Sequence, residues 1–401
     1  MKQSYLFVSL FIPIACLVAP SVARAGRDVA PWGISNQRTG PGATRMGDSG
    51  VASPMHTRLA SPVRPGQYTI IDAPGAGTAA GQGTIVVAIN SSSLVSGFYV
   101  DGSGYSHGFL RASDGTFTTF DANGPHSQTQ IWWMNDLGSV VGNYVDSNGF
   151  SFGFLRNAAG KIKKFSLGST FVYSVDRRSE IVGGYFDSSF IEHGFFRLKN
   201  GTTTPFDAPD AVNGTVAFDI NAPGAIVGPY SDAAGAFHGY LRSAAGAFTE
   251  FDVSGAGTGM GQGTYPVGIN RAGWTTGTYF DAGNVGHGFV RDNDGNITTF
   301  DAPDAGLLGA TWPIDINVHG QTTGRYVDAA KTSHGFVRSK GGKFIEFDPP
   351  DVGTGTIVMT QPYDIIDDGI IAGWDVDGSN VFHGFLRAPD REQLTKASMK
   401  R

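Results

Sequence analysis

The stretch HGFLR at His107–Arg111 decides the fold, because the chain repeats it and the other landmarks keep a fixed distance from it. Related segments end at Arg156, Arg197, Arg242, Arg291, Arg338 and Arg387. A period of about 45 residues is typical of stacked or circular units, none of which can bury its apolar face alone. The sequence therefore predicts one repeat domain over residues 68–388, although the length alone would allow several domains.

Around each HGFLR segment the landmarks follow in one order. Each unit has an Asn, and a Gly follows it by seven residues. An Asp lies four residues after the Gly, the His six after that Asp, the Arg four after the His and a second Asp ten after the Arg, with few exceptions. Short segments of alternating apolar residues lie between these points, bounded by Asn-x-x-Gly and Asp-x-x-Gly turns. This pattern predicts four antiparallel strands per unit. The only variable length, from the second Asp to the next Asn, marks the connection between units.

The ends of the repeat region predict how the array closes. A lone outer strand at residues 68–73 precedes the first unit, and the seventh unit stops after its third strand, His383–Arg387. If the N-terminal strand completes the last unit, the result is an all-β, seven-bladed β-propeller of four-stranded blades with no exposed edge. The 58 glycines and the short β-branched and aromatic runs suit an all-β fold. An open β-solenoid with distinct capping units is the alternative.

An inner INxxGxIVG-type segment, a loop, an H(G/A)F segment and a turn into an outer strand follow each other in every unit. This order resembles the bacterial "probable extracellular repeat, HAF family" across residues 68–388. The chain departs from that pattern with His-Gly-Phe for His-Ala-Phe, with Arg after it, and with FDAPG where the family often has LGTLGG. The resemblance implies a secreted repeat protein and supplies no established reaction.

The N-terminus predicts export. Residues 1–25 join Lys2 to an apolar run and an Ala23-Arg24-Ala25 cleavage pattern, which is typical of a signal peptide. A signal anchor is the alternative, as is a lipoprotein signal at Cys16, the only cysteine. Residues 26–67 are interpreted as a disordered Pro- and Gly-rich linker, and residues 389–401 as a C-terminal tail. We expect a secreted monomer without a transmembrane segment in the mature chain; a periplasmic or cell-surface location remains open.

Charge excludes nucleic acid as a partner. Without the signal peptide the chain has 27 basic and 35 acidic residues. The linker has a net charge of about +3, so the excess of acidic residues lies in the rest of the chain and the repeat region is strongly acidic. Nucleic-acid binding depends on neutralising phosphates with Lys and Arg. The basic linker could contact an anionic surface, although a plain spacer is the simpler interpretation.

An Asp-x5-His pair recurs in six units, and Phe152 replaces the histidine in the second unit. One such pair would suggest catalysis or a metal, but a pair in almost every unit is more naturally a hairpin lock. The seven motif arginines are interpreted as ties between units or strands, with the second Asp of each unit as a candidate partner. The predicted structural pairs are Asp101 with His107, Asp187 with His193, Asp232 with His238, Asp281 with His287, Asp328 with His334 and Asp377 with His383.

A ligand site should lie where the repeats differ. Two residues before the Asn, the variable positions include Trp133, Asp219, Asp315 and Asp364, which could gather at one end of the axis and bind a cation or polar ligand. Alternatively, each carboxylate bonds the backbone of a neighbouring unit. Among the inner-strand aromatic residues, Tyr265 and Trp312 are the better candidates for stacking on a ligand.

No catalytic motif appears, and we predict no catalytic residue, no metal and no cofactor. DVDGSN at Asp375–Asn380 is an incomplete calcium-loop pattern, so calcium there is the weaker alternative. The favoured function is a non-catalytic binding or scaffolding module for a polysaccharide or protein, with the variable loops between units as the ligand surface. An extracellular polysaccharide hydrolase or lyase that uses the axial aspartates is the alternative, and a structural surface protein is the second.

Overall fold

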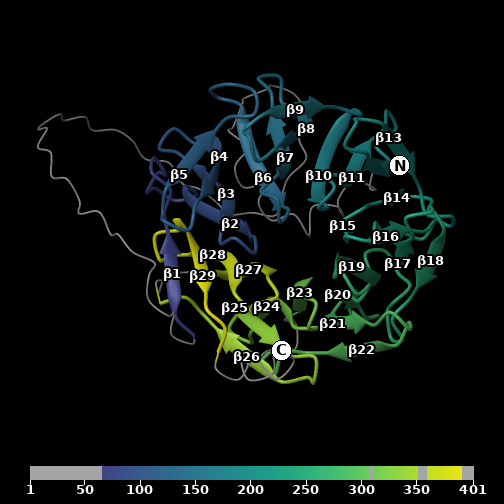
Figure 1. The fold of residues 1–401 in the computed structure, drawn as a ribbon. Helices are drawn as coiled ribbons and strands as arrows, with labels where there is room; N and C mark the ends of the chain where they lie inside the picture. The colour runs from purple at the N-terminus through teal and green to yellow at the C-terminus, as the bar shows by residue number, and fades with distance from the viewer. Residues whose placement is uncertain (1–65, 307–309, 351–358, 391–401) are drawn as a thin grey trace, which may run out of the picture. The chain divides into compact units, whose positions relative to one another are not determined.

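The computed structural model describes residues 66–306, 310–350 and 359–390, and every regular element within these ranges is a β-strand (Figure 1). The predicted signal peptide, almost all of the linker and all but two residues of the tail lie outside the described residues. Nowhere in the three described ranges is there a helix of the length and apolarity that crossing a membrane requires.

The strands form consecutive antiparallel units, one for each sequence repeat, ordered from an inner strand near the centre of Figure 1 to an outer strand at the rim. The first three units comprise β2 (Gly83–Ile89), β3 (Val95–Val100), β4 (Ser106–Arg111), β5 (Phe117–Phe120); β6 (Gln128–Met134), β7 (Val140–Val145), β8 (Ser151–Arg156), β9 (Ile162–Phe165); and β10 (Ser169–Val175), β11 (Ile181–Phe186), β12 (Glu192–Arg197), β13 (Thr203–Phe206). The next two comprise β14 (Gly214–Thr215), β15 (Asp219–Ile220), β16 (Ile226–Ser231), β17 (Phe237–Arg242), β18 (Phe248–Phe251); and β19 (Gly263–Ile269), β20 (Thr275–Phe280), β21 (Gly286–Arg291), β22 (Ile297–Phe300). The last two comprise β23 (Thr311–Ile316), β24 (Thr322–Val327), β25 (Ser333–Arg338), β26 (Phe344–Phe347); and β27 (Met359–Ile365), β28 (Ile371–Val376), β29 (Phe382–Arg387).

The first strand of the chain, β1 (Tyr68–Ile71), pairs with the last, β29, with Tyr68 opposite Arg387. The other edge of β29 pairs with β28, and beyond the end of β1 the strand also touches β2 through a single parallel pair, Phe382 with Gly83. One sheet therefore contains strands of the sixth, seventh and first units, and no sheet closes on itself. The predicted pairing of the N-terminal strand with the last repeat is confirmed, although the strand ends at Ile71 rather than at residue 73.

The phenylalanine of the HGFLR motif supplies the core between units. This position is fully buried in every unit, as Phe109, Phe154, Phe195, Tyr240, Phe289, Phe336 and Phe385. From the second unit onward its ring meets the outer-strand Phe of the preceding unit edge-on, with centroids 6.0–6.3 Å apart. Aromatic pairs prefer this arrangement over face-to-face stacking.

The motif arginines bind the same outer-strand rings. The guanidinium carbon of Arg156 lies 4.8 Å from the Phe120 centroid and that of Arg387 4.6 Å from the Phe347 centroid, and the four units between them repeat the contact. Each of these arginines therefore ties its unit to the one before it through a cation–π contact. The suggested partner, the second Asp of each unit, is wrong, because that carboxylate bonds a histidine.

Six inner strands carry a bulge that the alternation pattern did not predict. In β2 the ladder skips from Val86 to Ala88, and β6, β10, β19, β23 and β27 repeat the shift. The bulge redirects the side chain two residues before the Asn. On the partner strand Gly97 is required, because a Cβ there would lie 2.0 Å from the carbonyl oxygen of Ile85.

The fourth inner strand is interrupted between β14 and β15. Its partner strand β16 carries Pro229, which has no backbone N–H to donate to the carbonyl of Val216. The Tyr240 hydroxyl donates to that carbonyl instead, at 2.8 Å. A side chain thus replaces one ladder hydrogen bond at this point.

Candidate functional site: an acidic axial pocket

Each predicted Asp–His pair is part of a three-residue cluster. In six units the histidine Nε2 lies 3.4–3.6 Å from the hairpin aspartate, and its Nδ1 lies 2.7–2.9 Å from the aspartate that ends the outer strand. The hairpin aspartate also accepts backbone N–H groups, as Asp101 does from Ser103 and Tyr105. The fixed fourteen-residue spacing was the available signal for the second carboxylate. Six copies of one geometry indicate a structural element rather than a single reactive site.

The cluster of the seventh unit contains a partner from the segment that follows β1, Asp72, whose hydrogen bond raises the pKa of His383 to about 9. A pKa raised on folding gives stabilisation that is complete below the unfolded value of about 6.5 and is lost as the pH rises through about 9. We therefore expect His383→Phe, which copies the natural Phe152, to destabilise the protein at pH 6. Urea unfolding of wild type and variant should give stabilities that converge above pH 9. A difference that does not change with pH would show that the ion pairs contribute nothing.

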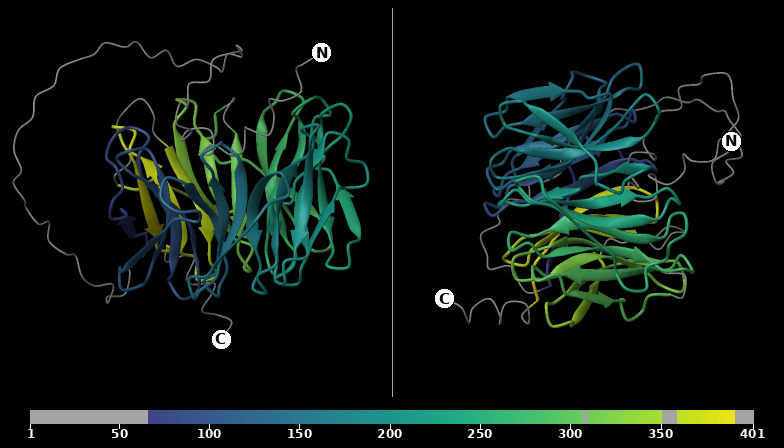
Figure 2. Two further views of the ribbon diagram at one scale, coloured as in Figure 1. Left: turned by 90° about the horizontal axis from the view of Figure 1, so that it is seen from above. Right: turned by 90° about the vertical axis from the view of Figure 1, so that its right-hand side faces the viewer.

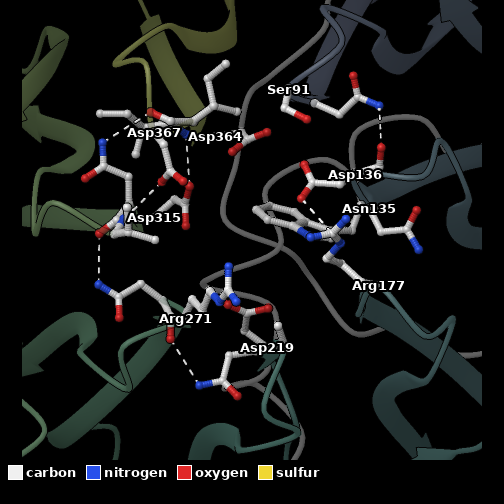
Figure 3. A pocket seen from close by; sticks show the side chains of 18 of the residues that line it. Ser91, Asn135, Asp136, Arg177, Asp219, Arg271, Asp315, Asp364 and Asp367 are labelled. Carbon is white, nitrogen blue, oxygen red and sulfur yellow. Dashed lines mark hydrogen bonds and ion pairs between the residues drawn. The ribbon is translucent and has the colours of Figure 1, made fainter. Parts of the chain in front are cut away.

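One pocket of about 350 Å³ is lined by residues from the inner strands or following turns of all the units (Figure 3). It lies where the inner strands end, at the level of the Asn residues. Figure 2 shows the strands running between the two ends of the domain, and the described parts of the variable loops precede the inner strands, so these parts lie at the end opposite the pocket. Of the predicted ligand residues, Trp133, Asp219, Asp315 and Asp364 line this pocket.

The three aspartates are nine-tenths buried, and each bonds the inner strand of the next unit. The Oδ2 atoms of Asp219, Asp315 and Asp364 accept the backbone N–H groups of Ile269, Ile365 and Ile89, respectively, at 2.8–2.9 Å. The last bond joins the seventh unit to the first. The alternative interpretation of the sequence, in which each carboxylate bonds the backbone of a neighbouring unit, is therefore confirmed for these three residues.

The second oxygens of these carboxylates are also engaged. Oδ1 of Asp219 accepts from the Ser174 hydroxyl at 2.7 Å and from its neighbour's backbone, and burial raises the pKa of Asp219 to about 6. Asp315 and Asp364 hydrogen-bond each other, and burial raises the pKa of both, most of all that of Asp364. Two carboxyl groups in contact cannot both ionise readily, so the pair holds one proton between its facing oxygens.

A second set of ties, from the Asn residues that end the inner strands, surrounds the mouth of the pocket. The side-chain amides of Asn90, Asn135, Asn221, Asn270 and Asn317 each donate to a backbone carbonyl of the next unit, at 2.7–3.3 Å. Each Asn also accepts backbone N–H groups of its own turn, for example Leu94 to Asn90. Sequence reasoning treated these residues only as turn formers; their recurrence in five units was the signal for a second role.

The two aromatic candidates lie outside this pocket. Tyr265 is buried and packs against Phe218 and Phe237, so it serves the core. Trp312 is half-buried and carries the guanidinium of Arg325 on its face. Trp133 is therefore the aromatic side chain that could contact a ligand beside the aspartates.

The pocket combines hydrogen-bonding and acidic groups without a metal constellation. Within the described ranges no group of three His, Cys, Asp or Glu residues is arranged to hold a metal ion. At the rim of the pocket, Nε of Arg177 lies 3.9 Å from Oδ2 of Asp136. Asp367 and Asp368 also line the pocket and add negative charge. Such a pocket can accept hydrogen bonds from a hydroxylated ligand or attract a cationic one.

Comparisons with known proteins show similarity in fold. No protein-family model matches the chain, and no curated protein is similar to it in sequence. A catalytically inactive virginiamycin B lyase from Staphylococcus aureus, solved with quinupristin, is 14% identical, with 80% of this chain and 99% of that one covered and a TM-score of 0.52. A streptogramin B lyase is 12% identical, with 80% of this chain and 97% of that one covered and a TM-score of 0.51. A prolyl endopeptidase is 14% identical, with 76% of this chain and 50% of that one covered and a TM-score of 0.51.

At these identities the likeness concerns the fold alone. Virginiamycin B lyase is a β-propeller, and nearly its whole length superposes on the repeat region described above. The chain therefore has an all-β fold of the β-propeller type.

Proposed function

We propose that the protein is a secreted binding module, built as a closed seven-bladed β-propeller, that holds a polar ligand in the acidic axial pocket. The observation that carries the proposal is the lining of one pocket by all the inner strands. Closure is supported by the β1–β29 pairing and by the Asp364 bond to Ile89, which repeats between the last and first units the contact found between others. Membership of the HAF family, export and a monomeric state are parts of the same proposal, resting on the repeat pattern and the N-terminal sequence.

A binding role is favoured over catalysis by the state of the aspartates. A general acid or base needs a carboxyl group that can reach the reacting atom, but both oxygens of Asp219 and one oxygen each of Asp315 and Asp364 are held by the protein. The remaining oxygens of Asp315 and Asp364 face each other. We therefore place the polysaccharide hydrolase or lyase second, and the purely structural surface protein third.

The ligand class follows from the pocket lining. Buried carboxyls and backbone groups suit hydroxyl donors, and the half-buried Trp133 offers an apolar face, a combination that suits a polysaccharide segment. The loops at the opposite end remain the alternative surface, best suited to a protein ligand. No cofactor is part of the proposal. Calcium binding at Asp375–Asn380 would be detected as a shift in melting temperature in the screen described below.

The test is a screen of polysaccharides and calcium by melting temperature on the purified mature protein. A ligand that binds only the native state at 100 times its Kd adds about 2.7 kcal/mol of stability. We expect a saturable shift that is lost in the Asp315→Asn, Asp364→Asn double variant, which keeps an acceptor for each backbone N–H. No shift across the panel would contradict the proposal, and release of shortened chains would favour the hydrolase or lyase.

A further inference from the structure

Arg325 is a guanidinium group without an anionic partner. It lies on β24 directly opposite Trp312 on β23, with its central carbon 4.3 Å from the centroid of the Trp312 ring. Within the residues that the structure describes, its guanidinium group forms no ion pair and no hydrogen bond. Burial lowers the pKa of Arg325 to about 10, so the group still carries its charge at neutral pH.

Four of the other stacked arginines differ from Arg325 in one respect. Arg156, Arg291, Arg338 and Arg387 lie over a phenylalanine, and each also donates to a backbone carbonyl, as Arg291 does to Asp292. The stacked ring and the carbonyl acceptor together account for these arginines as structural contacts between units. Arg325 has the ring but not the acceptor. Arg242 also has no acceptor among the described residues, but it lies over Phe206 and so serves the contact between units. A charged donor that is partly removed from water without a new acceptor is destabilised.

No other unit has a charged residue at this position of the second strand. The equivalent residues are Phe98, Asn143, Gly184, Pro229, Thr278 and Trp374. Two of them show what the position faces: Asn143 donates to the Thr170 carbonyl at 2.6 Å and Thr278 to that of Thr311 at 3.2 Å, both on the inner strand of the next unit. Arg325 by the same geometry faces β27, and it is close enough to Tyr363 for the two to interact electrostatically.

The position is also separate from the acidic pocket. Trp312 is the second residue of its inner strand, at the end entered from the variable loop, whereas Asp315 lies toward the Asn at the other end. Trp312, Arg325 and Tyr363 are all half-buried, so solvent reaches this level of the domain.

We propose that Arg325, held flat on Trp312, binds the carboxylate of a small acid such as a sugar acid at the loop end of the inner strands. The planar guanidinium presents paired N–H donors that match the two oxygens of a carboxylate. Trp312 fixes the plane, so little side-chain freedom is lost when the acid binds. This site lies beyond the proposed polysaccharide pocket and takes an anionic ligand, whereas that pocket suits hydroxyl donors.

The test titrates the mature protein with glucuronate and follows binding by tryptophan fluorescence and calorimetry. Glucose is the uncharged control with the same sugar ring, and acetate is the control that has the carboxylate without the sugar. Saturable binding of glucuronate, weaker binding of acetate and no binding of glucose are expected. Arg325→Met, which keeps an unbranched apolar stem over Trp312, should abolish binding, and Arg325→Lys should weaken it about tenfold because the paired donors are lost.

Two further measurements separate this site from the axial pocket and from a structural role. The Asp315→Asn, Asp364→Asn variant should bind glucuronate like the wild type, even if the polysaccharide screen fails. Without ligand, Arg325→Met should melt at the same temperature as the wild type or higher. The inference is overturned if wild type binds no carboxylate, if Arg325→Met retains binding, or if that variant melts lower without ligand.

Discussion

A mature chain that lacks residues 66–73 is expected to lose cooperative folding of the repeat domain at physiological temperature. These residues contain β1, which covers the free edge of β29 with four paired residues. They also bury Ile71 and Ala73 in a cluster with Phe109 of the first unit, and supply Asp72 to His383. Losing this apolar burial and the edge pairing should cost on the order of 5 kcal/mol, comparable to the whole stability of a typical domain.

The matched control starts at residue 66 and keeps β1 while removing everything before it. Thermal unfolding followed by circular dichroism should show a sharp transition for the control. For the shorter chain we expect a broad, strongly lowered transition or aggregation through the exposed strand edge. Equal transitions in the two chains would show that β1 is not needed to complete the last unit.

Replacing Glu192 with Gln is expected to stabilise the protein markedly above neutral pH. Glu192 begins β12 and is only 3% exposed, and neither carboxyl oxygen has a hydrogen-bond partner among the described residues. Its carboxyl occupies the space left by Gly184, where a Cβ would lie 2.3 Å from Oε1. Burial accordingly raises the pKa of Glu192 to about 8.

The sign of the pH dependence follows from this shift. Below about pH 4 the folded and unfolded states both hold the proton, so the group has no effect on stability. Between about pH 4.5 and 8 the unfolded state ionises while the folded state does not, and stability falls as the pH rises. Above about pH 8 the folded state must bury a charge, and the accumulated loss is on the order of 5 kcal/mol.

The glutamine side chain cannot ionise and has nearly the same shape, so this loss should be absent from Glu192→Gln. Urea unfolding at pH 5 and pH 9 measures the effect: the variant should gain most at pH 9 and little at pH 5. Asp294→Asn, which removes a charge from an exposed turn, should leave the pH profile of the wild type unchanged. Equal pH profiles for wild type and Glu192→Gln would mean that the carboxyl finds a polar partner in solution.

Periodicity predicted most of the strands because local and tertiary preferences agree in this chain. Turn residues at fixed offsets mark each hairpin, and the repeated HGF segment fixes which strand enters the core. The bulge of the inner strand was missed because it reverses the expected alternation, although a proline borders the shift in three strands, at Pro266, Pro313 and Pro362. It depends on how neighbouring units pack, which a single repeat does not encode.

The candidate site was predicted in part. Variation between repeats correctly drew attention to Asp219, Asp315 and Asp364, and the structure brings them to one pocket. It could not show that their oxygens bond the next unit, because that contact joins residues about 50 positions apart, or 275 for Asp364. Glu192 and Arg325 were missed for a related reason: each is a single exception at a position where the other repeats carry no charge.

Closure of the ring is tested most directly by amide hydrogen exchange of β1 and β29. If β1 completes the seventh unit, the amides of β1 that bond β29 should be protected like those of the central strands. They should exchange in the same cooperative opening as β29, and the Ile89 amide bonded by Asp364 should join them. Exchange of the β1 amides at the rate of an unstructured segment, with β29 still protected, would contradict a closed seven-bladed propeller.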